Sequence, residues 1–173
     1  MIDSDITKGR IILYTEKDLK DLEVLNVFRE KVRENKILYN AGDLGEVYAI
    51  SLAQTLGACS LLTNDTKQGG PYMSLLQFND EVMPFNFTDI LILRYLFDGV
   101  DEIQTVTDFN KINESSNLNI SFISQLKKFI KRFLTNPYNN NDKEWIEKLI
   151  SKNQINNLKE KFQVLKKAIE SAN

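Results

Sequence analysis

The chain has 173 residues, of which 42% are hydrophobic and 27% are charged, enough for a packed core in one domain of ordinary size, alone or with a helical appendage. It has no histidine and one cysteine, which excludes Ser-His-Asp and Cys-His chemistry, histidine metal ligands, a cysteine-built zinc site and an internal disulfide. No apolar run approaches the roughly 20 residues of a membrane span, and no signal peptide is visible, so we expect a cytoplasmic protein with no membrane partner.

Charge is distributed unevenly along the chain. Residues 1–120 hold 11 Lys/Arg against 19 Asp/Glu, whereas residues 121–173 hold 11 against 5. An acidic body followed by a basic tail suits a metal-carboxylate site beside a surface that attracts a polyanion. A solvated helix rich in lysine explains the tail equally well.

The first half of the chain reads as alternating strands and helices. The β-branched apolar run at 10–14 predicts a buried strand, and apolar residues spaced by three or four predict a helix over 16–34. A second helix is expected over 44–56, with Gly57 ending it. The run at 58–63 is short and leads into a polar loop, so it predicts another buried strand. This order points to a parallel α/β sheet.

The second half is mainly helical by the same criteria. Residues 85–87 predict a third strand, Thr88 is expected to cap a helix over 89–98, and Asp101 to cap another. Ser121 opens a strongly amphipathic helix that carries Lys127, Lys128, Lys131 and Arg132 on its polar side. Residues 136–141 read as a linker. Beyond it, one or two tail helices end in a coiled-coil-like seam, at Ile155, Leu158, Phe162, Leu165 and Ile169.

Two acidic residues could carry chemistry. Glu46 opens the helix expected over 44–56, and Asp65 lies at the C-terminal end of a predicted strand, where ligands bind in open parallel sheets. If the two carboxylates converge, they could hold a divalent cation that activates water. Each also has a purely structural interpretation, because Asp43 and Glu46 have the spacing of a capping box and Asp65 could form an Asx-turn.

The run from Ala41 to Lys67 resembles the C-terminal half of a PIN-domain nuclease, a family that includes many toxins of bacterial toxin-antitoxin pairs. The resemblance implies a three-layer α/β/α sandwich on a short parallel sheet, over residues 1–135, with a helical extension over 136–173. It implies that Glu46 and Asp65 are metal ligands and catalytic residues for the hydrolysis of RNA with Mg²⁺ or Mn²⁺. The residues expected to contact RNA are Thr63, Asn64, Lys67, Lys127, Lys128, Lys131 and Arg132.

The chain departs from the family at its start. The resemblance implies that the strand and helices bearing the family's first metal-site aspartate are absent here. Asp3 or Asp5 could replace that aspartate, although no apolar strand surrounds them. Two hypotheses follow. The chain is a PIN-like ribonuclease, a toxin or defence component that is degenerate or completed by a partner, or it is a non-catalytic PIN-like interaction or regulatory module. In either case we expect a protein partner or a homo-oligomer, formed through the incomplete sheet edge or the C-terminal helix.

Overall fold

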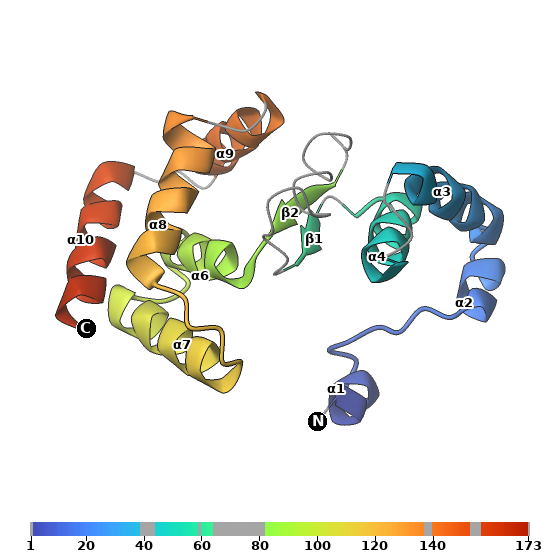
Figure 1. Cartoon of the computed structure of the whole chain (residues 1–173), viewed down its shortest axis with the longest axis horizontal. Helices are drawn as coiled ribbons and strands as arrows, with labels where there is room; N and C mark the ends of the chain where they lie inside the picture. The colour runs from blue at the N-terminus through green and yellow to red at the C-terminus, as the bar shows by residue number, and fades with distance from the viewer. Residues whose placement is uncertain are drawn as a thin grey trace. The chain divides into compact units, whose positions relative to one another are not determined.

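The computed structural model describes residues 2–38, 44–58, 60–63, 82–136, 140–152 and 157–172. The chain divides into two compact units, Met1–Leu61 and Leu62–Asn173. The helices after residue 136 therefore belong to the same unit as residues 82–136, whereas the sequence predicted a domain boundary at residue 135. Figure 1 shows the elements of both units.

The N-terminal unit is helical, with α1 (Ile2–Thr7), α2 (Glu16–Asp21), α3 (Leu25–Leu38) and α4 (Leu44–Thr55). The strand predicted over 10–14 is wrong: this segment has no regular structure, and Ile12 and Leu13 are 70% and 64% exposed. A strand needs a neighbour for its backbone groups, and no described strand pairs with these residues.

The predicted helix over 16–34 is interrupted. Glu23 adopts a left-handed backbone conformation, with φ of 61°, which ends α2 and lets α3 start in a new direction. The helix over 44–56 is confirmed as α4, and Gly57 ends it with φ of 66° while the amide of Ala58 donates to the carbonyl of Ala53 at 2.8 Å. This is the hydrogen bond of a glycine C-cap.

Helices α3 and α4 pack side by side (Figure 1). Val32, Val47 and Ile50 are buried in the unit. A polar contact crosses the same interface, where the buried Asn35 donates to Ser51 Oγ and Gln54 Oε1, each at 2.9 Å. Because a buried amide is stable only in a register that supplies its partners, Asn35 fixes how α3 and α4 align.

Two short strands, β1 (Ser60–Leu62) and β2 (Met83–Phe85), form a two-stranded parallel sheet. The remaining described elements are helical: α6 (Phe87–Leu96), α7 (Glu102–Ser115), α8 (Phe122–Ile130), the π-helical turn η1 (Lys131–Thr135), α9 (Asn140–Lys152) and α10 (Leu158–Ser171). The predicted α/β/α sandwich is therefore wrong. The apolar runs that suggested strands are too few and too short to build a sheet that helices could cover on both faces.

Several helix starts follow the expected chemistry. Asp101 and Ser121 cap α7 and α8, as predicted, by accepting from the amides of Gln104 and Ser124. The cap of α6 is Asn86 instead of Thr88, because Asn86 and Asp89 satisfy each other's amides in a capping box.

The C-terminal unit has one hydrophobic core, drawn from β2 and all of its helices. Phe109 on α7 stacks on Phe122 of α8 with ring centroids 4.2 Å apart. Phe162, Leu165 and Ile169 are buried in this core, so this part of the predicted seam packs within the chain itself. In the described part of the protein, no helix combines the length and hydrophobicity that a membrane crossing requires.

Candidate functional site

Of the two acidic residues of the predicted metal site, the structure describes Glu46 alone. Glu46 is half-buried in the first turn of α4, in the N-terminal unit. Asp65 lies outside the described residues, as do Asn64 and Lys67. Thr63 directly follows β1, and its amide donates to the carbonyl of Phe85 at 2.8 Å. Among the described residues, no group of three or more acidic or cysteine side chains is placed to hold a metal ion.

The predicted basic face of the amphipathic helix is only partly on the surface. Lys127 and Lys128 on α8 and Lys131 at the start of η1 are exposed. Arg132 is 3% exposed, so it cannot contact RNA from that face in this fold. In η1 the backbone is wound as a π-helix, and both Arg132 and Phe133 are buried in the unit.

Arg132 instead forms a buried ion-pair cluster. Its Nε and one terminal nitrogen donate to the two carboxylate oxygens of Asp142 on α9, at 3.2 and 3.1 Å. Its other terminal nitrogen donates to the carbonyl of Pro84 at 2.8 Å and lies 3.6 Å from Asp89 of α6. Bidentate pairing of this kind is both strong and geometrically specific.

The second carboxylate of the cluster, Asp89, is desolvated. Burial raises the pKa of Asp89 above its usual value, although the amide of Asn86 and the charge of Arg132 act in the opposite direction. All three side chains are deeply buried and fully engaged with each other and with the backbone. The cluster therefore connects β2, α6, η1 and α9, and its role is to hold the unit together.

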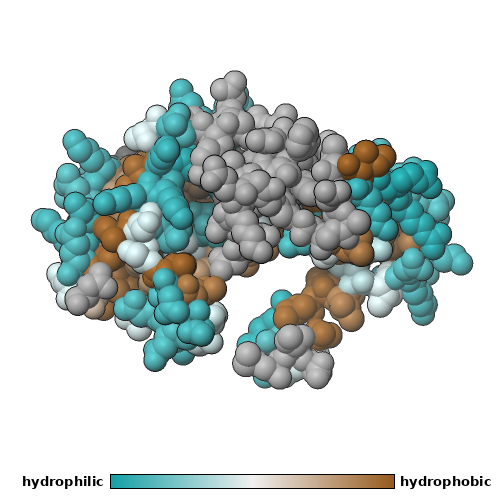
Figure 2. Space-filling view, in the orientation of Figure 1, coloured by the Kyte–Doolittle hydropathy of each residue, from teal (hydrophilic) through white to brown (hydrophobic). Residues whose placement is uncertain are grey.

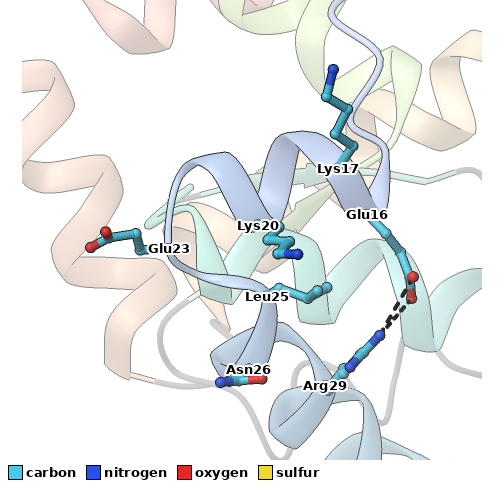
Figure 3. Close-up of a pocket in the computed structure, with 7 residues that line it drawn as sticks. All are labelled: Glu16, Lys17, Lys20, Glu23, Leu25, Asn26 and Arg29. Carbon is cyan, nitrogen blue, oxygen red and sulfur yellow. Dashed lines mark hydrogen bonds and ion pairs between the residues drawn. The ribbon is translucent and has the colours of Figure 1, made fainter.

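A hollow in the N-terminal unit lies at the elbow between α2 and α3 (Figure 3). Arg29 spans it to Glu16, at 3.4 Å. In Figure 3 the side chains of Lys17 and Glu23 point away from this pair. The charged lining residues are exposed and carry both signs of charge. They do not converge on a point where a reacting atom or an ion could be held.

A second hollow has a different character. It lies between α8 and α10 of the C-terminal unit and has a volume of about 560 Å³, within the range typical of ligand sites. Its apolar lining comes from both helices and from η1: Ile123, Leu126, Ile130, Leu134, Leu158 and Phe162. Figure 2 shows apolar surface among the hydrophilic side chains that cover this unit. We call this hollow the α8/α10 groove.

The floor of the groove is formed by residues of the hydrophobic core. Leu126 and Phe162 are almost completely buried and belong to the core of the unit, so they are held in place by packing. Ile123, Ile130 and Leu158 are half-buried, and Leu134 is 37% exposed. The π-helical turn carries Leu134 and Thr135, which also line the groove. Turns of this type occur frequently at functional sites.

The opposite side of α10 has a related hollow of about 500 Å³, lined by residues of α7 and α10. Its large exposed apolar side chains are Ile103, 69% exposed, and Val164, 39% exposed. Polar residues such as Glu102, Asn110 and Ser171 form a larger share of its lining than they do in the α8/α10 groove. The α8/α10 groove is the more continuous apolar surface of the two.

The sequence pattern contains a partial signal for the groove. The helix predicted from Ser121 has an apolar side too broad for one contact, and the tail seam adds a second apolar helix face. The pattern could not show that these two faces share one core and leave a groove between them. For the ion-pair cluster there was no signal, because Asp89, Arg132 and Asp142 follow no motif.

We also compared the chain with known proteins. No protein-family model, curated protein or solved structure matches it.

Proposed function

We propose that the C-terminal unit is a protein-binding module that accepts an apolar helical segment of a partner in the α8/α10 groove. The observation that carries this proposal is the groove's lining, with six apolar side chains contributed by two adjacent helices and a π-helical turn. A helix laid between two neighbouring helices buries its apolar face as in a helical bundle.

The spacing of the lining residues supports a helical ligand. Ile123 and Ile130 are seven positions apart on α8, about two turns, so they project from the same side of that helix. Leu158 and Phe162 are four positions apart on α10. Such rows of side chains form the ridges and grooves with which helices pack against each other.

The experiment uses a fluorescein-labelled amphipathic peptide of about four helical turns, with leucines on one side and only uncharged polar residues on the other. Fluorescence anisotropy should show saturable binding to the full chain. Leu134→Gln should weaken it by about tenfold, since it removes one exposed apolar contact.

The matched control is Ile103→Gln, which removes an exposed apolar side chain from the hollow beside α7. It should leave the affinity unchanged, and circular dichroism should show both variants to be folded. Binding that is equal in the parent and in Leu134→Gln, or an absence of binding to any such peptide, would refute the proposal.

Metal-dependent hydrolysis of RNA by Glu46 and Asp65 stays a prediction from the sequence, and the described geometry adds nothing in its favour. The PIN-like fold that motivated it is not found.

A further inference from the structure

The α8/α10 groove is bordered by positive charge on both walls. Lys127 on α8 and Lys159 and Lys166 on α10 line it together with the apolar residues. All three lysines are exposed. Among the described lining residues there is no aspartate or glutamate, so the border of the groove has one sign of charge.

The pairing of these lysines within the chain is weak. Lys166 lies 3.6 Å from Glu170, one turn further along α10, and both side chains are more than half exposed. An exposed pair of this kind contributes little free energy. Within the described residues, Lys127 and Lys159 have no carboxylate within 4.0 Å. All three ammonium groups can therefore pair with a ligand.

The spacing of the lysines matches the repeat of a helix lying along the groove. Lys159 and Lys166 are seven positions apart on α10, which places them about 10.5 Å apart along the same side of the helix. Lys127 approaches from the opposite wall. A ligand helix lying along the groove would present residues to α10 at the same two-turn interval.

We propose that the α8/α10 groove selects a partner helix that carries acidic residues, about two turns apart, along the border of its apolar face. This inference rests on the proposed function and adds the chemistry of the partner. The apolar floor supplies contact area, and the three lysines select the acidic helix and orient it, because charges at the rim of an interface contribute mainly to specificity and to the rate of association.

Other occupants fit the groove less well. A nucleic acid would pair with the lysines and leave the apolar lining exposed to water, whereas binding of nucleic acid rests chiefly on phosphate contacts. An anionic membrane would need a face that projects apolar residues outward, but here Leu126 and Phe162 lie at the floor of a hollow.

The test compares three peptides that share one leucine face and differ only at its border, which carries glutamate, glutamine or lysine. At low salt the glutamate peptide should bind to the full chain about three- to tenfold more tightly than the glutamine peptide, and the lysine peptide most weakly. The preference should shrink as salt is added, because exposed charges are screened.

The double variant Lys127→Gln with Lys159→Gln should remove most of the preference and retain binding of the glutamine peptide. The matched control is Lys111→Gln with Lys128→Gln, which removes two exposed lysines that do not line the groove and should preserve the preference.

The outcomes separate this inference from the proposed function. Equal binding of all three peptides at low salt would overturn the inference and leave the proposed function standing. Binding of none would overturn both. Two further results would overturn the inference because they would show that something other than an acidic helix occupies the groove. One is competition by a single-stranded RNA or by vesicles of anionic lipid, in place of competition by the unlabelled acidic peptide. The other is a stable dimer of the chain that excludes every peptide.

Discussion

At the scale of single residues, Asp142 is the main partner of Arg132 in the buried ion-pair cluster of the C-terminal unit. It is 1% exposed and takes two hydrogen bonds from Arg132, which is itself buried. Changing Asp142 removes these two hydrogen bonds and leaves Arg132 with the more distant Asp89, at 3.6 Å, as a counter-charge. Losing one partner from a buried ion pair costs far more than the intact pair contributes relative to apolar residues.

We therefore expect Asp142→Asn to lower the free energy of unfolding by about 3–5 kcal/mol, measured by urea denaturation followed through the fluorescence of Trp145. The matched control is Glu144→Gln, two positions along α9, where the side chain is exposed and pairs with Lys148 at 3.8 Å. It should change stability by less than about 0.5 kcal/mol. Equal losses in the two variants would show that the cluster contributes nothing special.

Asp89 makes the stability of the C-terminal unit depend on pH. Because burial raises its pKa in the folded state, the folded protein holds this proton more tightly than the unfolded chain does. The contribution of Asp89 to stability is complete below the unfolded pKa of about 4 and is lost as the pH rises through the folded value.

Asn at position 89 cannot ionise, and its side-chain oxygen can still accept from the amide of Asn86. Relative to the parent, Asp89→Asn should therefore become progressively more stable as the pH is raised from about 4. Urea denaturation across this range measures the difference between the two proteins. A difference that stays constant with pH would contradict the assignment of a raised pKa to Asp89.

At the scale of elements, local chemistry predicted the helices better than the fold class. The caps at Asp101 and Ser121 and the end of α4 at Gly57 were correct, because each depends on a few adjacent residues. The break between α2 and α3 at Glu23 was missed, since glutamate is not a residue typical of a positive φ.

The error in fold class has a related cause. A short β-branched run such as residues 10–14 is typical of a buried strand, but a strand exists only when another strand pairs with it. Pairing is not local, and the sequence pattern does not reveal it. The resemblance of residues 41–67 to a PIN domain carried the same weakness, because a helix followed by a short strand is compatible with many folds.

The helix period predicts the exposure of some residues on the basic helix correctly and of others wrongly. The exposure of Lys127 and Lys128 could be predicted from the helix period alone. Arg132 was assigned to the same face, but the π-helical turn and the buried partner Asp142, ten positions away, place it in the interior. Contacts of this kind depend on tertiary packing, and the tertiary packing overrides the period of the helix.

At the scale of the whole molecule, the division into two units predicts two separate unfolding transitions. The core of the C-terminal unit is formed by residues from Phe85 to Ile169, and the core of the N-terminal unit by residues such as Val32 and Ile50. Two units with separate cores can each unfold cooperatively, and then one free energy of unfolding does not describe the chain.

The single tryptophan makes this testable in the intact protein. Trp145 packs against Phe85, with ring centroids 5.0 Å apart, so its fluorescence reports the C-terminal unit. The far-ultraviolet circular dichroism reports the helices of both units.

Ile50→Ala should destabilise the N-terminal unit by about 2–5 kcal/mol, because Ile50 is fully buried there. Part of the helical signal should then melt earlier while the Trp145 transition keeps its midpoint. Leu165→Ala, equally buried in the C-terminal unit, should lower the Trp145 midpoint. If Ile50→Ala moves both transitions together, the prediction of two separate transitions is wrong.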